Sequence, residues 1–188
     1  GTSENEIKSE DLSRTIREAR RDSSIKAIVL SINSPGGSAF GSEVIWREVK
    51  LAAETKPVIA SMGDVAASGG YYIACAADTI MANRTTITGS IGIFGMIPNM
   101  QKLLSDKLGI TQDVVTTNEH SDMISITRPM TSFERDLMQQ TIEEGYETFI
   151  SRVAEGRKMQ KTAIDEIGQG RVWAATNAKE ITLIDVYG

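Results

Sequence analysis

Residues 27–32 (AIVLSI) lead into residues 33–38 (NSPGGS), and residues 57–62 (PVIASM) lead into residues 63–70 (GDVAASGG). Each pair is a short β-branched run, typical of a strand buried on both faces, followed by a turn that contains adjacent glycines. Apolar residues at helical spacing lie before, between and after these runs. Strands that alternate with helices over short connections predict an α/β fold with largely parallel pairing.

The rest of the chain continues this alternation, and we expect one domain over residues 1–188. Polar residues 118–130 indicate an irregular loop. A long helix is predicted after it, capped by Thr131 or Ser132 and ended by Gly156, with one apolar face made of Phe133, Leu137, Ile142, Tyr146, Phe149, Ile150 and Val153. We expect the other helices at 9–22, 44–53, 66–77, 103–108, 162–169 and 177–180, and further strands at 79–82, 112–116 and 172–173.

Composition and charge argue against several classes of function. The 20 basic and 25 acidic residues give a net charge of −5, whereas a nucleic-acid partner requires clustered Lys and Arg to neutralise its phosphates. The single cysteine, Cys75, rules out an intrachain disulfide, and with one histidine it cannot supply a four-ligand zinc site. We expect no metal and no cofactor. No run of about 18 apolar residues is present, so we expect any membrane anchor to lie outside this chain.

The two glycine-bearing turns are the best candidates for chemistry. Ser68 lies at or near the start of a helix rich in small residues, where its hydroxyl can face a substrate carbonyl. The free N–H of Gly69 would help to hold an oxyanion at the positive end of that helix, and Gly37 N–H is the natural second donor. The alternative is that Ser68 is only a helix cap and that 33–38 is only a turn. Two such turns about 30 residues apart in one βα layout favour the catalytic interpretation.

Four stretches resemble the protease IV (signal peptide peptidase A) family of Ser–Lys peptidases. They are NSPGGS (33–38), SMGDVAASGGYYIACAAD (61–78), TGSIGIFG (88–95) and GRVWAATNAKEITLID (170–185). The resemblance runs from about Asp11 to the end of the chain and is closest to the C-terminal half of double-length members. It implies the Clp protease–crotonase superfold, a superhelix of β-β-α units with a helical C-terminal segment used in oligomerisation. It also implies Ser68 as nucleophile, Gly37 and Gly69 as oxyanion donors, and Ser90 as the residue that orients the catalytic lysine.

The general base is harder to find in this sequence. A serine hydroxyl needs a neighbour that takes its proton, and the only histidine, His120, lies 52 residues after Ser68 in a polar loop that suggests a surface position. The resemblance aligns the lysine of single-length members with Ser121. Lys102 and Lys107 lie on a helix whose charged face is expected to be solvated. In double-length members the N-terminal half supplies the lysine, so we expect it to come from outside this chain, which by itself would be weakly active or inactive.

The first predicted element is a polar helix with no strand before it, and we expect an upstream strand and a lysine-bearing half to be missing. The resemblance implies a homo-oligomer that cleaves signal peptides and other apolar unfolded peptides on the extracytoplasmic (periplasmic) side of a membrane. An apolar substrate cleft is a further expectation, although core packing would also explain its residues, Val65, Ala66, Ile91 and Ile93.

Two other functions fit part of the pattern. A crotonase-type acyl-CoA enzyme also builds an oxyanion hole from two turns but places a carboxylate near it, and Asp64 and Glu43 are the nearby candidates. A non-catalytic assembly module would use the apolar face of the long helix for contacts between subunits.

Overall fold

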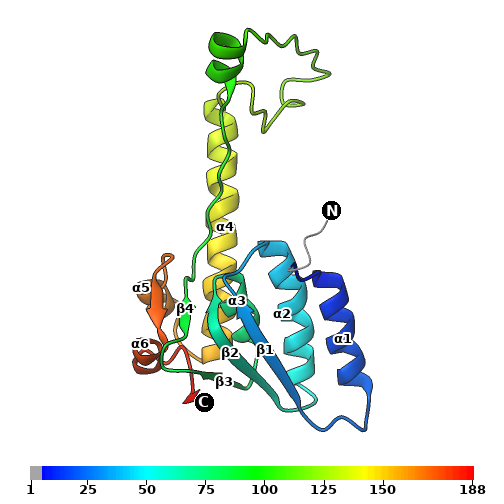
Figure 1. Ribbon diagram of the computed structural model, residues 1–188, viewed down its shortest axis with the longest axis vertical. Helices are drawn as coiled ribbons and strands as arrows, with labels where there is room; N and C mark the ends of the chain where they lie inside the picture. The colour runs from blue at the N-terminus through cyan, green and yellow to red at the C-terminus, as the bar shows by residue number, and fades with distance from the viewer. Residues whose placement is uncertain (1–5) are drawn as a thin grey trace. The chain divides into compact units, whose positions relative to one another are not determined.

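The computed structural model describes residues 6–188, which form two compact units (Figure 1). The first unit comprises residues 6–93 and 145–188, and the second comprises Phe94–Glu144. The first is built on a mixed sheet in which β2 (Val58–Ala67) pairs in parallel with three neighbours. Those neighbours are β1 (Ile28–Ser34), β3 (Thr79–Ala82) and β4 (Ile87–Gly89), and the outer strands are β5 (Val172–Ala174), antiparallel to β4, and β6 (Val186–Tyr187), parallel to β3.

Helices pack on this sheet and close the core of the first unit. Helix α1 (Ser9–Arg21) lies against α2 (Ala39–Ala53), which in turn packs on α3 (Gly69–Ala74) (Figure 1). The remaining helices of this unit are the C-terminal part of α4 (Ser132–Arg157), α5 (Lys161–Ile167) and α6 (Ala175–Glu180). The largest core side chains include Trp46, Val49, Tyr71, Tyr72, Ile80, Ile91, Phe149, Val153 and Leu183.

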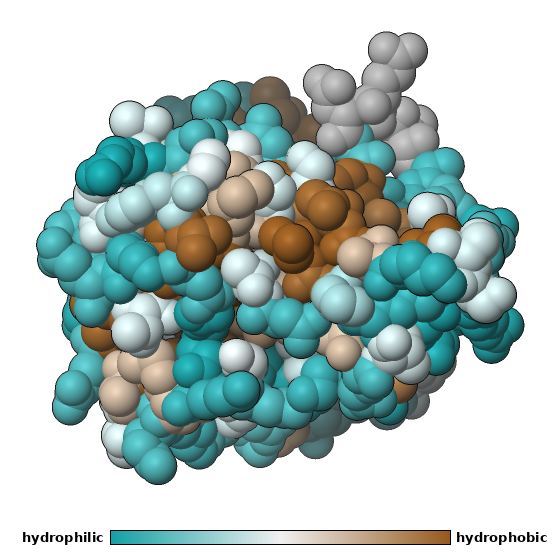
Figure 2. Space-filling view, turned by 90° about the horizontal axis from the view of Figure 1, so that it is seen from below, coloured by the Kyte–Doolittle hydropathy of each residue, from teal (hydrophilic) through white to brown (hydrophobic). Residues whose placement is uncertain are grey.

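The sheet is covered less completely than the apolar runs suggested. Along β1 only Ile32 is fully buried, and Val29 is 66% exposed. The expectation that 27–32 is buried on both faces was therefore wrong, because alternate side chains of β1 point away from the helices and that face stays uncovered. Figure 2 shows one face of the molecule on which hydrophobic side chains gather into a patch bordered by hydrophilic ones.

The second unit is mostly irregular. The predicted helix at 103–108 is a single π-helical turn, η1 (Leu103–Lys107), and residues 118–130 are irregular as expected. The strand predicted at 112–116 is wrong: no strand forms there, and Val115 is 94% exposed. A β-branched run becomes a strand only where a partner edge and a buried face are available, and this run has no such partner within residues 6–188.

Helix α4 begins where the sequence predicted. Thr131 Oγ1 accepts a hydrogen bond from Glu134 N (3.2 Å), and the Glu134 carboxylate accepts one from Thr131 N (2.8 Å), which is a reciprocal capping box. The predicted apolar face is buried only toward its C-terminal end, at Phe149 among others. Phe133 and Leu137 are 52% and 38% exposed.

Helix α3 is shorter than the predicted 66–77 helix, because β2 continues through Ala67. Residues 65–67 pair with residues 87–89 of β4, and this pairing holds the chain extended up to Ser68. Helix α4 runs through both units, and the single domain expected over residues 1–188 stays a prediction. Among residues 6–188, no helix is long and apolar enough to cross a membrane.

Candidate active site

The two turns singled out from the sequence meet at one edge of the sheet. Strands β1 and β2 are parallel neighbours, and Ser34 is paired with Ala66 after a register shift that follows Ile32. The carboxyl ends of parallel neighbours point the same way, so the chain leaves both strands at the same place. Residues 34–38 therefore face the segment that begins at Ser68.

Glycines allow the two backbones to touch. A methyl group added at Gly36, whose φ is +108°, would lie 2.7 Å from Gly69 N. One added at Gly69 would overlap Ser42 Oγ and lie 3.2 Å from Gly37 N. Such distances leave no room for any side chain between the turns. The structure thus brings together the two residues, Gly37 and Gly69, that the sequence nominated as oxyanion donors.

Ser68 has an uncommon backbone conformation, with φ 52° and ψ −120°. Its N–H donates to Gly89 O (2.9 Å), and its carbonyl accepts from Tyr72 N (2.8 Å). Its side chain is half-buried and forms no capping hydrogen bond with α3, so the helix-cap alternative is not supported. Residues held in such conformations cost about 1–3 kcal/mol and occur preferentially at functional sites.

Ser90 lies next to the strand that supports Ser68. It follows β4 directly, one residue after Gly89, whose carbonyl accepts the Ser68 N–H. Ser90 also has a positive φ, 49°, and its own N–H donates to Arg171 O (2.7 Å). Both serines are thus held by backbone hydrogen bonds of one small region.

The apolar residues proposed for a substrate cleft divide into two groups. Ala66 and Ile91 are 0% exposed and belong to the core, which corrects their nomination, because a substrate cannot touch them in this conformation. Val65 and Ile93 are half-buried and remain available for contact.

The candidate residues for the general base have local partners in the second unit. His120 is exposed in the second unit and stacks on Phe133 (4.4 Å between ring centroids), as expected for a loop residue. Ser121 Oγ donates to Asn118 O (3.1 Å), which holds it within a local turn. Within residues 6–188, several lysine ammonium groups have other partners. They donate hydrogen bonds to the carbonyls of Ala19, Asp22, Ser23 and Asp185 and form ion pairs with the carboxylates of Glu147 and Glu155.

The carboxylates that an acyl-CoA enzyme would need are not placed for that chemistry. Glu43 accepts a hydrogen bond from Tyr72 OH and forms an ion pair with Arg152 (2.7 Å). Asp64 is exposed. The sequence suggests Glu43 only as a possible acid or base. Its partners Tyr72 and Arg152 lie 29 and 109 residues away along the chain, and no local pattern points to them.

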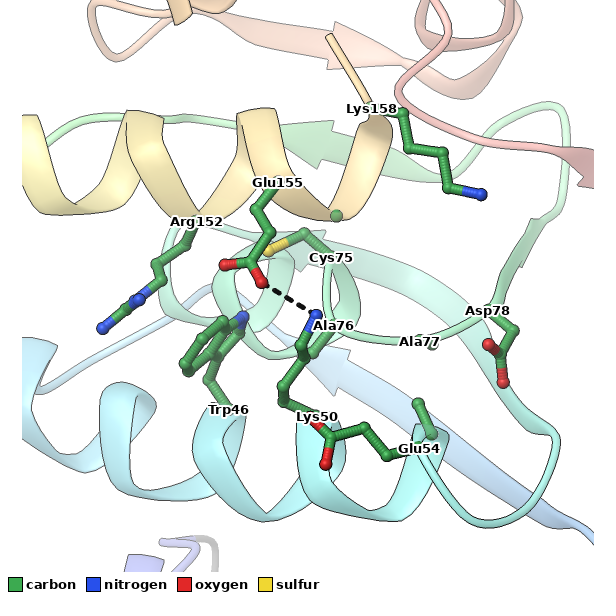
Figure 3. Close-up of a pocket in the computed structure, with 12 residues that line it drawn as sticks. Trp46, Lys50, Glu54, Cys75, Ala76, Ala77, Asp78, Arg152, Glu155 and Lys158 are labelled. Atoms are coloured by element: carbon green, nitrogen blue, oxygen red, sulfur yellow. Dashed lines mark ion pairs between the residues drawn. The ribbon is translucent and has the colours of Figure 1, made fainter.

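A cavity of about 220 Å³ lies at the other end of α3 (Figure 3). It is lined by residues of α2 and α4 and by residues 75–78, which follow α3, whereas Ser68 precedes that helix, so Ser68 is not among its lining residues. Burial raises the pKa of the Cys75 thiol, which lines it, to about 12, and the thiol is therefore not a ready nucleophile. Among the described residues, no group of three or more His, Cys, Asp or Glu side chains could hold a metal ion.

Comparisons with known proteins identify the families and structures that this chain resembles. The model of peptidase family S49 matches residues 50–188, and that of Clp protease matches residues 3–90. The chain is 44% identical over 178 residues to Protease 4 of Haemophilus influenzae, covering 94% of this chain and 29% of that protein. It is 48% identical over 174 residues to Protease 4 of Salmonella typhi (92% and 28%) and 40% identical over 183 residues to the chloroplastic serine protease SPPA of Arabidopsis thaliana (97% and 27%).

The chain thus spans less than a third of the length of these relatives. Among solved structures, a ClpP1 mutant from Listeria monocytogenes superposes with a TM-score of 0.64 at 16% identity, covering 96% of this chain and 83% of that one. This likeness confirms the predicted α/β fold of the Clp protease type.

Proposed function

The chain belongs to peptidase family S49, and we propose that it is the serine-bearing part of a Ser–Lys endopeptidase with Ser68 as nucleophile. The observation that carries the proposal is the contact between the two turns: it sets Gly37 N–H and Gly69 N–H beside a serine whose hydroxyl is not used as a cap. An acyl-CoA enzyme gains no support, because Glu43 is already paired with Arg152.

The proposed reaction follows from these positions. Ser68 Oγ attacks the scissile carbonyl carbon, and its proton passes to a neutral lysine amine. The carbonyl oxygen becomes an oxyanion that accepts hydrogen bonds from Gly37 and Gly69. When the C–N bond breaks, the lysine ammonium returns the proton to the leaving amine. Water then hydrolyses the acyl-enzyme by the same proton route and frees the Ser68 hydroxyl.

We propose that the lysine comes from residues outside this chain and that Ser90 orients it. Ser121 occupies the position where single-length relatives are expected to carry the lysine, and its hydroxyl is held in a turn of the second unit. A lysine base needs a desolvated position from which its amine reaches Ser68 Oγ. Lys102 and Lys107 are exposed, so neither is desolvated as such a base must be.

Signal peptides and other apolar, unfolded peptides are the proposed substrates, cleaved on the extracytoplasmic side of a membrane. Val65 and Ile93 would contact side chains of an extended peptide beside the two turns. A homo-oligomer is also proposed, because the Clp protease fold supports assembly and α4 exposes Phe133 and Leu137.

A comparison of the chain alone with the chain joined to a lysine-bearing N-terminal half tests the proposal. The readouts are hydrolysis of a short apolar peptide ester and labelling of Ser68 by a serine-directed acylating probe. We expect slow reaction for the chain alone, rapid reaction for the joined protein and none for the Ser68→Ala variant of either. Full activity of the chain alone would contradict an external lysine and return His120 to consideration. Activity that survives Ser68→Ala would overturn the assignment of the nucleophile.

A further inference from the structure

Side-chain contacts join the helices that follow the two glycine turns, close to the candidate active site. Tyr72 on α3 donates its hydroxyl hydrogen to Glu43 Oε2 on α2. Arg152 of α4 binds the other oxygen of the same carboxylate, with Nη2 2.7 Å from Oε1. Both oxygens of Glu43 therefore have a partner, and the three side chains join α2, α3 and α4.

Each member of this group is itself held in place. The Tyr72 ring packs on Phe149 (4.6 Å between centroids) and edge-on against Trp46 (6.5 Å). The Arg152 guanidinium lies 4.1 Å from the centre of the Trp46 ring, and Figure 3 shows the two side chains together beside the cavity. Burial and the hydrogen bond to Glu43 raise the pKa of the Tyr72 phenol, so it remains a donor at neutral pH.

The group connects directly to both turns. Tyr72 N–H donates to Ser68 O, so Tyr72 is hydrogen-bonded directly to the backbone of the proposed nucleophile. Glu43 follows Ser42, whose Oγ donates to Ser38 O (3.0 Å) and occupies the space that a Gly69 side chain would need. A shift of α2 relative to α3 would therefore change the separation of Gly37 N–H and Gly69 N–H.

We infer that Tyr72, Glu43 and Arg152 are positioning residues that set the spacing of the two oxyanion donors. This inference rests on the proposed function and adds residues that do not touch the substrate. An oxyanion hole works only while its donors keep their geometry as charge develops on the substrate oxygen. A link that is anchored by an ion pair and ring packing can preserve that geometry where two glycine turns alone are pliable.

The variant Tyr72→Phe tests the link, because it removes one hydroxyl and keeps the ring against Trp46 and Phe149. In the protein joined to its lysine-bearing half, we expect kcat for the peptide ester to fall on the order of 10-fold with little change in KM, as for a small misplacement of transition-state contacts. The amide resonances of Gly37 and Gly69 should shift in ¹H–¹⁵N spectra. Glu43→Gln, which keeps an acceptor for Tyr72 but loses the charge, should give an intermediate loss.

Tyr71→Phe is the matched control. It removes the hydroxyl of the preceding residue on α3, which donates to Leu183 O (2.8 Å) and does not join α2. It should lower the thermal unfolding midpoint at least as much as Tyr72→Phe but leave kcat and the two glycine resonances unchanged. Equal losses of kcat in the two variants, or unchanged glycine resonances in Tyr72→Phe, would overturn the inference. If the unmutated protein does not cleave the ester while only Tyr72→Phe shifts the resonances, the positioning stands and the peptidase assignment fails.

Discussion

At the scale of single residues, the site depends on two conformations that are costly for most side chains. Ser68 and Ser90 both have positive φ angles, and each is held there by a backbone hydrogen bond from its own N–H. For Ser68 the acceptor is Gly89 O in β4, so the strain is maintained by the sheet and not by the turn alone. This arrangement places Ser68 directly before α3, with a half-buried side chain that does not cap the helix.

The glycines of the two turns should differ in their tolerance of a methyl group. Gly69→Ala places its Cβ against Ser42 Oγ and close to Gly37 N, and we expect a loss of about 1–3 kcal/mol in the free energy of unfolding. Gly37→Ala has nothing within 4 Å of the added Cβ and should change stability by less than about 0.5 kcal/mol. Urea unfolding of both variants measures the difference. A loss for Gly69→Ala as small as that expected for Gly37→Ala would contradict the close contact between the turns.

At the scale of elements, the start of α4 depends on one buried carboxylate. The Glu134 side chain is buried. Hydrogen bonds lower the pKa of its carboxyl from the ordinary 4.5 to about 2; the largest contribution comes from Arg128 and the next from Thr131 N–H. A carboxyl whose pKa is depressed in the folded state stabilises that state above its unfolded pKa. The contribution is lost as pH falls from about 4.5 toward about 2.

We therefore expect the first turn of α4 to lose its protection from amide exchange over that acidic window. The measurement is the protection factor of residues 134–137 at a series of pH values. Glu134→Gln should show weak protection already at neutral pH and a smaller dependence on acid. Some dependence should remain, because Arg128 also lowers the pKa of Asp122. Identical profiles for the variant and the unmodified chain would contradict the role of Glu134.

At the scale of the whole molecule, the last residues of the chain close the sheet of the first unit. Arg157, at the end of α4, binds both oxygens of Asp185, with Nη2 2.6 Å from Oδ1 and Nη1 2.9 Å from Oδ2. Asp185 Oδ2 also accepts from Ile80 N on β3 (2.7 Å), directly before β6 pairs with that strand.

Asp185→Asn should destabilise the chain by about 2 kcal/mol, because it weakens charge-assisted hydrogen bonds to the largely buried Arg157. Thermal unfolding checks the loss. Asp11→Asn is a suitable control, since the ion pair of Asp11 with Arg14 is exposed and such pairs contribute little. An equal effect of the two substitutions would argue against a stabilising role for the contacts of Asp185 with Arg157 and Ile80.

The sequence by itself determined strands β1, β2, β3 and β5, the two glycine turns and the start of α4, and it singled out Ser68, Gly37 and Gly69. These features depend on spacing, turn chemistry and capping within a few residues. Only the tertiary structure decided that β1 is exposed on one face, that residues 112–116 form no strand, and that Ala66 and Ile91 lie in the core. The same holds for the link from Tyr72 through Glu43 to Arg152, whose members are far apart in the chain. Burial and long-range pairing depend on which surfaces the folded chain places opposite one another, and no local pattern specifies that choice.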